Sequence, residues 1–565
     1  MNFYTDNDSL KFHLTHPDMK KIASLKERGF ADNGQYEDAP ANADEAIENY
    51  DRVLQLVGDI AGDVIAPNAE EVDHVGPHID NNSVVYAPGT QQNYDVLRQS
   101  GLFGISMPRK YHGLNFPYVP FIMTTEIISR ADTGFGTIWS LQDCAETISS
   151  FADEAIKDKF LPRIYEGASC SMDLTEPDAG SDLQSVRLKA TFDEANNCWR
   201  LNGVKRFITN GGADLHLVLA RSEEGTNDGR GLSYFVYDRN DGGMTVRRLE
   251  NKMGIKGSPT AELVFNNAPA YIVGERRLGL IKYVMTLMND ARLGVGSQSV
   301  GLCEAACREA VAYAAEREQF GQAIEKFPAV RDLLTTMRAR TDAARTLLYE
   351  TSRMVDTYKA YEAKGKVESD ERADYKAAQR SADILTPLLK LSASEFANRN
   401  AYDCIQVHGG SGFMKEYACE RLYRDARILS IYEGTSQLQV VAAQKGIANG
   451  AYIAKIEEYD ARPIHKDLEP LRELLRQATA NYKNLAELAN ANADTDYDFR
   501  RMQTDVIAAI IMGYLLIFDV NRQLGGDETC TRSFMPSARY MTAHAHAESL
   551  RSASVEIHLI NDKTE

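Results

Sequence analysis

The spacing of apolar residues changes along the chain and separates helical regions from a strand-forming one. Within residues 42–167, apolar side chains recur at close to 3.6 residues, the period of a helix with one buried face. In the first such stretch they are Ile47, Val53, Leu54, Val57 and Ile60. Asn42 or Asp44 is placed to cap the start of this helix. We therefore expect a helical domain over 42–167, preceded by an N-terminal extension over 1–41.

Between residues 168 and 278 the apolar period falls to two, which is the period of a half-buried strand. The alternation is clear over 186–192 and again over 215–219. Asn202-Gly203 lies between two strand-like runs and predicts a hairpin turn there. Further strands are expected at the segments 232–238, 244–250 and 260–265. This region is predicted to be a middle, antiparallel β domain.

Beyond residue 279 the helical period returns in long stretches, which is typical of a helical bundle over 279–450. A charged segment at 361–376 interrupts the bundle and is expected to be a solvated helix extension or a loop. A further helical block follows over 451–565, with breaks expected at 491–498 and 525–530. The predicted fold class is therefore α+β: an N-terminal helical domain, the β domain, the bundle and an additional C-terminal helical domain.

The last helical block contains the longest apolar run of the chain, at 506–518. This run is shorter than the roughly 18–20 residues that span a bilayer, so we expect a buried core helix and no membrane segment. The block shows no acid–base cluster, and we expect it to pack on the bundle and to hold the protein at the dimer. Its second apolar stripe consists of Leu468, Leu471, Leu474 and Leu475. The N-terminal residues show no secretory signal, so a cytoplasmic protein is expected.

The chain has 565 residues with 81 acidic and 63 basic side chains, so its formal charge is −18. This acidic balance argues against a nucleic-acid-binding protein, because phosphate recognition needs a basic face. The eight cysteines include no C-x-x-C pair, so their spacing indicates neither a zinc site nor a disulfide framework, and no metal is expected. Cys303 and Cys307 would share a helix face, where two small buried side chains are expected.

Four separated parts of the chain contain residues that suggest chemistry. The first is LTEPDAGSD at 174–182, followed in the strand region by KRFITNGG at 205–212. The others are EREQFGQ at 316–322 and QVHGGSGF at 406–413, which leads to RDARILSIYEGTSQLQ at 424–439. Any one of them alone could be an ordinary turn or helix end. Together, in this order and spacing, they resemble the acyl-CoA dehydrogenase flavoprotein family over residues 45–449.

This resemblance implies both the fold and the cofactor. Members of the family have an N-terminal helical domain, a middle β domain and a helical bundle, with FAD between them. The N-terminal extension and the final block are similar to those of the long bacterial subgroup, which includes enzymes acting on methylthiopropionyl-CoA. The glycine pairs of the chain form no GxGxxG fingerprint, which argues against a Rossmann dinucleotide site.

The first segment and KRFITNGG correspond to the residues that line the flavin ring in the family. By this resemblance the flavin contacts are Met172, Leu174, Thr175, Ser181, Phe207, Ile208 and Thr209. Ser181 is also implied to reach the pantetheine arm of coenzyme A. Where the family often has tyrosine and tryptophan, this chain has Met172 and Phe207, and the phenylalanine still supplies a flat apolar wall.

Two further segments correspond to residues that reach FAD in a neighbouring subunit. They are Arg317, Gln319 and Phe320, together with Gln406, Gly409 and Gly410. An arginine suits this role because its planar guanidinium holds a pyrophosphate well, and glycines let a backbone come close. The alternatives are a solvated helix arginine and a simple helix stop at the glycine pair. The resemblance thus implies a homo-oligomer, with a dimer favoured.

Glu433, in the sequence IYEGTSQ, corresponds to the base that removes the α proton of the acyl thioester in the main branch of the family. A carboxylate is needed because an α C–H is a weak acid, and an apolar pocket makes the carboxylate more basic. Gly434, Thr435 and Gln437 are implied to approach FAD. A smaller branch carries the base at the position of Ala291, which cannot serve. An exposed surface residue is the alternative for Glu433.

Asn289 and Arg292 match an element that lies near bound coenzyme A in the family, and an arginine pairing inside the bundle is the alternative. The predicted function is FAD-dependent α,β-dehydrogenation of an acyl-CoA to the trans-2-enoyl-CoA, with an electron-transfer flavoprotein as acceptor. One alternative is an acyl-CoA oxidase, which passes electrons to oxygen. Another is a non-catalytic relative that binds DNA or acts as a scaffold, against which Glu433 and the net charge argue.

Overall fold

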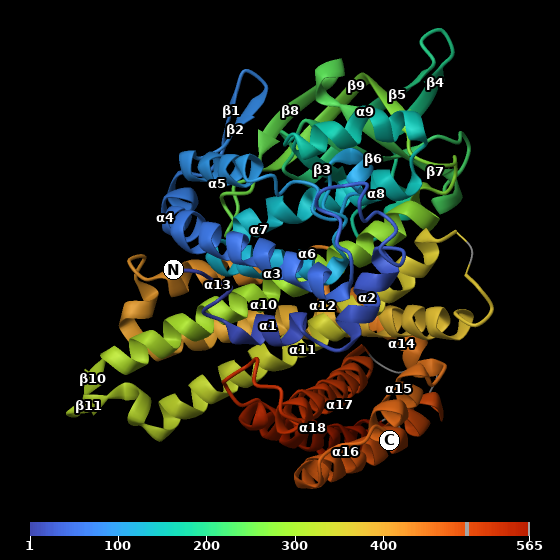
Figure 1. The fold of residues 1–565 in the computed structure, drawn as a ribbon. Helices are drawn as coiled ribbons and strands as arrows, with labels where there is room; N and C mark the ends of the chain where they lie inside the picture. Colours follow the sequence, from blue (N-terminus) through green and yellow to red (C-terminus); the bar gives the residue numbers. More distant parts are fainter. Residues whose placement is uncertain (366, 492–496, 563–565) are drawn as a thin grey trace. The chain divides into compact units, whose positions relative to one another are not determined.

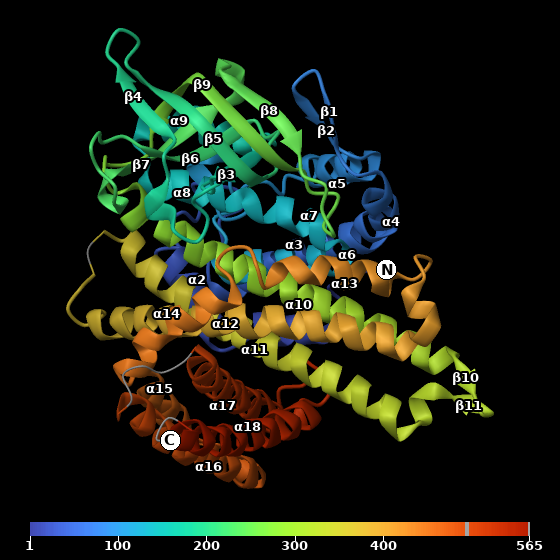
Figure 2. The same cartoon turned by 180° about the vertical axis from the view of Figure 1, so that it is seen from behind.

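The computed structural model describes residues 1–365, 367–491 and 497–562. The chain divides into two compact units, whose elements are labelled in Figure 1 and seen from behind in Figure 2. The first unit comprises Met1–Phe3 and Lys26–Gly294, and the second comprises Tyr4–Leu25 and Val295–Glu565. A seven-stranded sheet belongs to the first unit, and long helices dominate the second.

Helices form the N-terminal half of the first unit. The helix predicted at its start is present as α3 (Ala43–Ile60), and Asn42 caps it by accepting a hydrogen bond from the Glu45 N–H at 3.0 Å. α6 (Tyr118–Ala131) is buried on almost every side, as a central core helix is. The remaining elements here are α4 (Ala66–Val75), the hairpin of β1 (His78–Asp80) and β2 (Ser83–Val85), α5 (Pro88–Gln99), α7 (Thr133–Trp139), α8 (Asp143–Phe151) and α9 (Glu154–Tyr165).

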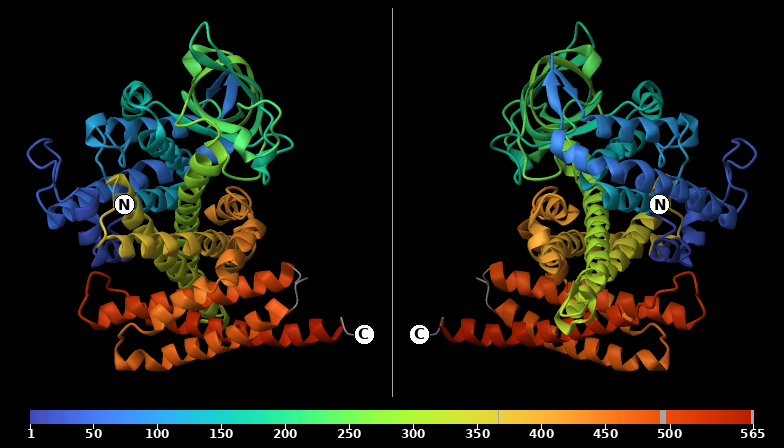
Figure 3. Two further views of the ribbon diagram at one scale, coloured as in Figure 1. Left: turned by 90° about the vertical axis from the view of Figure 1, so that its right-hand side faces the viewer. Right: turned by 90° about the vertical axis from the view of Figure 1, so that its left-hand side faces the viewer.

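Seven strands form a largely antiparallel sheet in the first unit. They are β3 (Cys170–Asp173), β4 (Lys189–Asp193), β5 (Cys198–Thr209), β6 (Leu215–Arg221), β7 (Leu232–Asp238), β8 (Met244–Leu249) and β9 (Thr260–Ile272). β7 pairs with both β6 and β9, so the strands close into a ring, which is visible in Figure 3. β3 and β4 pair parallel with β6, a departure from the purely antiparallel expectation. The strands predicted at 232–238, 244–250 and 260–265 are confirmed.

The hairpin predicted at Asn202-Gly203 is wrong, because β5 continues through both residues. The turn between β4 and β5 lies at 194–197 instead, where Asn197 has a φ of 50°. Gly203 meets a different need, since a Cβ at this residue would lie 2.9 Å from the Leu188 Cα atom. Only glycine therefore allows the two segments to approach this closely.

The alternation at 215–219 predicted a half-buried strand, but the strand is buried on both faces. His216 and Val218 are as buried as the leucines between them, so β6 is covered on both faces. Its central position explains this, because β6 pairs with β3, β4 and β7 and lies inside the unit.

The bundle of the second unit consists of α10 (Met285–Glu316), which begins in the first unit, with α11 (Pro328–Ala363), α12 (Arg372–His408), α13 (Ala418–Leu429) and α14 (Ser436–Ala448). Between α10 and α11 the short strands β10 (Glu318–Gln319) and β11 (Gln322–Ala323) pair. Cys303 and Cys307 are fully buried in the apolar core, as predicted. The charged segment spans the end of α11 and the start of α12, and its residue 366 lies outside the described residues.

The C-terminal block consists of α15 (Ala451–Asp460), α16 (Glu469–Ala491), α17 (Tyr497–Leu524) and α18 (Met535–Asp562). α17 and α18 both contact α11, which confirms that the block packs on the bundle. By length and composition the stretch Phe499–Leu524 could cross a membrane, but 89% of its apolar window is buried within the structure, as in a core helix. The predicted break at 525–530 separates α17 from α18. The break predicted at 491–498 falls largely on 492–496, outside the described residues.

The N-terminal extension contains α1 (Asp8–Leu14) and α2 (Asp18–Lys26). Within the second unit, α1 lies against the segment that joins α17 to α18. Phe12 packs on Phe534 with ring centroids 5.1 Å apart, and the Thr531 N–H donates to Asp8 Oδ2 at 2.7 Å. Arg522 of α17 donates to the Phe12 carbonyl at 2.7 Å. The N-terminal extension and the C-terminal block, both outside the 45–449 resemblance, are therefore in direct contact through α1.

Candidate active site

The predicted site residues are divided between the two units. The first unit contains the predicted flavin contacts, on β3, on β5 and in the loop after β3, together with Asn289 and Arg292 of α10. The second unit contains the β10–β11 hairpin, the glycine turn after α12, and the loop between α13 and α14 that includes Glu433.

Hydrogen bonds join β3 to the end of β5, where the sequence places the flavin contacts of the first unit. The Ser171 hydroxyl, next to Met172 in β3, lies 2.9 Å from the Thr209 carbonyl oxygen. The Arg206 N–H donates to the Thr175 carbonyl at 2.9 Å. The two segments, separated in sequence by a hairpin, are thus brought together in one region of the sheet.

Phe207 combines a strained backbone with an exposed ring. Its φ is 60°, in the left-handed region that residues other than glycine rarely adopt, and 54% of the residue is exposed. Such strain costs about 1–3 kcal/mol and is commonly found at ligand sites. Among the other predicted contacts, the hydroxyl groups of Thr175, Ser181 and Thr209 make no hydrogen bond with the described parts of the chain. An apolar ring together with unpaired hydroxyl groups fits a flat cofactor with a polar edge, as a flavin is.

A buried ion pair holds the loop after β3. The Lys205 ammonium is fully buried and donates to the Leu174 carbonyl at 2.8 Å and to Glu176 Oε1 at 3.0 Å. Glu176 also accepts the N–H groups of Arg187 and Leu188, at 2.8 and 2.9 Å. Burial lowers the pKa of Lys205, an effect that the Glu176 carboxylate opposes. Sequence reasoning assigned no role to Lys205 or Glu176, although both lie within the recognised segments.

A second buried pair lies beside Met172. The carboxylate of Asp173 is 2.9 Å from His216 Nδ1, and both side chains are fully inaccessible to solvent. His216 Nε2 faces the Ala213 carbonyl oxygen at 3.0 Å, so this nitrogen carries a proton. Ser171 Oγ lies 2.7 Å from the other Asp173 oxygen and completes the network. Asp173 and His216 are 43 residues apart, and only the parallel pairing of β3 with β6 brings them together.

In α10, the Arg292 guanidinium donates to Asn289 Oδ1 at 3.0 Å. The two residues, three apart, therefore face the same side of the helix.

Glu433 lies in the loop between α13 and α14 and has a φ of 54°. The side chain of Glu433 is half-buried, and so is that of the preceding residue, Tyr432. The Tyr432 hydroxyl donates a hydrogen bond to the Gln298 side chain of α10. A left-handed glutamate is energetically unfavourable and persists only where neighbouring contacts impose it. Gly434 also has a positive φ, of 89°, so two successive residues give the loop its shape.

The loop is fixed from the helix that follows it. The fully buried Gln439 donates from Nε2 to the carbonyls of Gly434 and Glu433, at 3.0 and 3.4 Å. Thr435 caps α14 by accepting a hydrogen bond from the Leu438 N–H at 3.3 Å. The sequence signal for Thr435 was its place in the motif, whereas Gln439 was missed.

The remaining predicted residues of the second unit are strongly exposed. Phe320, in the β10–β11 turn, has a φ of 50° and is 95% exposed, while Arg317 and Gln406 are also exposed. Gly409 has a φ of 61°, and a Cβ at Gly409 or Gly410 would meet no atom within 4 Å. A strained, exposed phenylalanine and a bare glycine turn are suited to contact another molecule.

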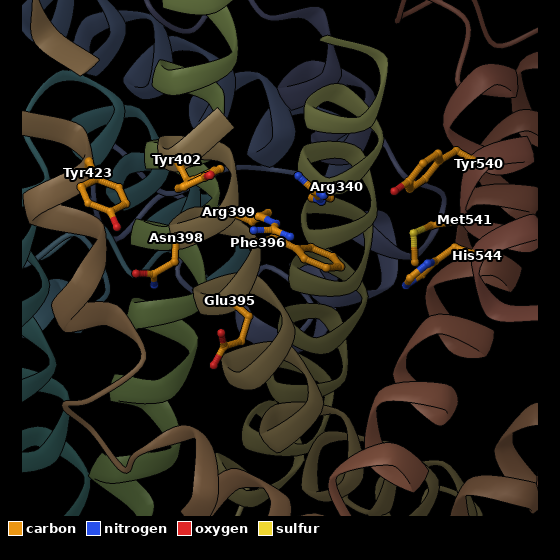
Figure 4. A pocket seen from close by; sticks show the side chains of 10 residues that line it. All are labelled: Arg340, Glu395, Phe396, Asn398, Arg399, Tyr402, Tyr423, Tyr540, Met541 and His544. Atoms are coloured by element: carbon orange, nitrogen blue, oxygen red, sulfur yellow. The ribbon is translucent and has the colours of Figure 1, made fainter. Parts of the chain in front are cut away.

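A cavity of about 470 Å³ lies within the second unit, and the residues that line it include none of those that the sequence predicted. Figure 4 shows that α18 contributes three side chains that point toward the bundle helices. The lining residues are Arg340, Glu395, Phe396, Asn398, Arg399, Tyr402, Tyr423, Tyr540, Met541 and His544. The C-terminal block thus forms one wall of the cavity.

Four family models match the chain in succession. They are the acyl-CoA dehydrogenase N-terminal domain at 48–168, the middle domain at 171–268, the C-terminal domain at 281–448, and a further model, acyl-CoA dehydrogenase C terminal, at 448–556. Together they span most of the chain, including the C-terminal block.

Individual relatives agree with these matches. The 3-methylmercaptopropionyl-CoA dehydrogenase of Ruegeria pomeroyi is 35% identical over 447 residues, which are 73% of this chain and 74% of the relative. An acyl-CoA dehydrogenase from Bacillus anthracis, solved in complex with FAD, superposes with a TM-score of 0.74 at 25% identity, covering 91% of this chain and 88% of the other. Butyryl-CoA dehydrogenase from Megasphaera elsdenii gives a TM-score of 0.62 at 30% identity, covering 71% and 98%.

Proposed function

The chain belongs to the acyl-CoA dehydrogenase family of FAD-dependent oxidoreductases, and on that premise we propose that it converts an acyl-CoA thioester to the trans-2-enoyl-CoA. The observation that supports this most is Glu433 in its left-handed loop, which Gln439 holds, since the sequence motif assigns this residue to the family's base. A positive φ is uncommon in a residue other than glycine and is enriched at active sites, which favours a functional role for Glu433.

For the proposed reaction the chain supplies a base, a hydrogen-bond donor to the thioester and a binding site for FAD. Glu433 takes the α proton of the thioester, and the N–H of the same residue donates to the thioester carbonyl as negative charge develops there. FAD, when bound, accepts the hydride that leaves the β carbon. In the first unit, Phe207 supplies an apolar wall, and the free hydroxyl groups of Thr175 and Thr209 supply hydrogen bonds to the cofactor. Ser181, Asn289 and Arg292 are assigned to coenzyme A.

Replacing the base tests the assignment directly. Glu433→Gln should retain FAD and lose at least ~10³-fold in turnover, the size of effect expected when a general base is removed. The readout is bleaching of the flavin absorbance on anaerobic mixing with a panel of acyl-CoAs. Glu416→Gln, which changes an exposed glutamate of the same region, is the matched control and should react normally. Near-normal flavin reduction in Glu433→Gln would refute the role of this residue.

The panel should begin with 3-methylmercaptopropionyl-CoA, because a relative that is 35% identical bears that name. Butyryl-CoA and longer acyl-CoAs test whether an unsubstituted chain is preferred. We assign the enzyme to the cytoplasm and expect an electron-transfer flavoprotein to accept its electrons. An oxidase is the alternative, and rapid stoichiometric peroxide formation during turnover would favour it.

We also propose a homodimer in which Arg317, Gln319, Phe320, Gln406, Gly409 and Gly410 reach the cofactor of the other subunit. The 95% exposed Phe320 and the 80% exposed Phe413 support this, since both rings lie in the segments assigned to the partner's cofactor and are accessible for contact. Sedimentation measures the assembly, and a monomer that keeps stoichiometric FAD would contradict the proposal.

A further inference from the structure

Two cysteines and a histidine meet in the core of the second unit, where α12 ends and α13 begins. Cys404 and His408 are one helical turn apart on α12, and Cys419 is the second residue of α13. All three are buried, and their potential ligand atoms lie within 4.8 Å of one another. Residue spacing does not predict this cluster, because the glycine turn Gly409–Phe413 separates the two helices and brings their ends together.

Contacts around the cluster fix the imidazole. His408 Nδ1 is 2.8 Å from the Cys404 carbonyl oxygen and 3.9 Å from Cys404 Sγ. The ring of Tyr313 stacks on the imidazole, with centroids 4.2 Å apart and planes at 24°. The Tyr313 hydroxyl is itself held by Ser411 of the glycine turn, at 3.2 Å. The carbonyl contact places the imidazole proton on Nδ1, so Nε2 is the nitrogen left to bind a metal, as in sites where the other ring nitrogen donates to a carbonyl.

The distances suit a small thiophilic ion. In tetrahedral coordination, metal–sulfur bonds of about 2.3 Å and metal–nitrogen bonds of about 2.0 Å separate ligand atoms by about 3.5–3.8 Å. The observed separations are at most 4.8 Å, so shifts of about 1 Å or less would bring all three atoms into coordination range. The Cys419 thiol, now 3.5 Å from the Gly412 carbonyl oxygen, faces the same small space.

The charge balance also favours a divalent ion. Two thiolates, one neutral imidazole and one divalent cation make a site with no net charge, which avoids the cost of burying an isolated charge. Sulfur and imidazole ligands select zinc over magnesium or calcium.

We propose that Cys404, His408 and Cys419 form a zinc site that fastens the glycine turn to α12 and α13. The fourth position is open to a water molecule or to the Gly412 carbonyl. No residue of this site takes part in the proposed dehydrogenation step. Its role is to fix the turn that contains Gly409 and Gly410.

Metal analysis of the full-length protein tests the site. Protein produced with added Zn²⁺ and dialysed under reducing conditions should retain about one zinc ion per chain. Cys404→Ser and Cys419→Ser should each retain at least about tenfold less. Cys303→Ser changes an equally buried cysteine of the same core outside the cluster, and it should retain zinc like the wild type.

A measurement on the wild-type chain covers the case in which the serine variants fail to fold. Replacement of the bound metal by Co²⁺ should give the thiolate-to-cobalt charge-transfer absorption of a sulfur-ligated site. Wild-type protein that binds neither Zn²⁺ nor Co²⁺ under reducing conditions would overturn the proposal. A metal-free chain that is two hydrogens lighter, with Cys404 joined to Cys419 in peptide mapping, would also overturn it, because the pair would then be a disulfide.

Discussion

Removal of the Lys205 ammonium should destabilise the first unit and loosen the loop that the proposed flavin contacts occupy. In Lys205→Met a side chain of similar length replaces the buried cation, so the apolar packing is largely kept. Glu176 then remains buried with its charge, and the Leu174 carbonyl loses its only side-chain donor among the described contacts. The variant therefore separates the effect of the ion pair from that of side-chain volume.

The structure sets the size of the effect. Breaking a buried ion pair by removing one partner typically costs about 3–5 kcal/mol. Glu176 keeps two backbone hydrogen bonds, from Arg187 and Leu188, which places the loss at the lower end of that range. The unpaired Leu174 carbonyl adds about 1 kcal/mol. We expect the free energy of unfolding to fall by about 3–4 kcal/mol.

Tryptophan fluorescence reports this unit alone. The chain has two tryptophans, Trp139 and Trp199, and both are buried in the first unit. Urea unfolding followed by their emission therefore measures the unit that contains the mutation. Lys189→Met, at an exposed lysine of β4, is the control and should change stability by less than about 0.5 kcal/mol.

The double variant Lys205→Met/Glu176→Gln gives a sharper test. With both charges removed, no uncompensated charge is buried, so the double variant should be more stable than Lys205→Met by at least about 1 kcal/mol. Two results would show that the ion pair does not hold this loop. One is an unfolding midpoint of Lys205→Met at the same urea concentration as that of the wild type. The other is a double variant that is less stable than Lys205→Met alone.

Three further predictions concern the second unit. Burial raises the pKa of Asp519 to about 7, above the usual 3.8, so between about pH 4 and 7 the folded state holds a proton that the unfolded state releases. The free energy of unfolding should therefore fall by about 1.4 kcal/mol per pH unit as the pH rises through this window. In urea titrations at different pH values, Asp519→Asn should remove most of this pH dependence. Arg532→Ala should cost about 3 kcal/mol, because the buried Asp342 loses two 2.7 Å hydrogen bonds, whereas Arg539→Ala at an exposed site should cost under about 0.5. Gln439→Leu should lower kcat about tenfold without loss of FAD, since the Glu433 loop loses its anchor; an unchanged kcat would show that the loop holds its shape alone.

The helical and strand regions were predictable because they depend on local periodicity. The segment 232–238 is mostly apolar, and in 244–250 apolar and polar residues partly alternate. Both patterns predict strands, and both segments are strands in the structure. The continuation of β5 through Asn202-Gly203 was not predictable from local sequence, because an Asn-Gly pair indicates a hairpin only where the backbone is free to reverse. Here the close approach of Leu188 demands a glycine inside a continuous strand. A tertiary contact thus overrode a local preference.

The site was predictable in part for the same reason. Glu433 and its neighbours form one continuous motif, so the order of residues located them. Asp173 with His216, and Lys205 with Glu176, depend on pairings between strands and loops that no short segment encodes. Cys404 and Cys419 are likewise brought together by a turn. The residues missed were those that position others, and except for Gln439 their partners lie far away in the sequence.

The C-terminal block is attached by charge as well as by apolar packing. The Arg532 guanidinium donates twice to Asp342 of α11, at 2.7 Å, and once to Ser9 of α1, at 3.2 Å. Asp342 is fully buried and also accepts from Ser537 of α18, at 2.6 Å. A buried carboxylate is tolerated only with its partners in place, so α11, the N-terminal helix and the C-terminal block depend on one another. Within the second unit, the part of the N-terminal extension at Tyr4–Leu25 is therefore a structural component of the block rather than a separate appendage.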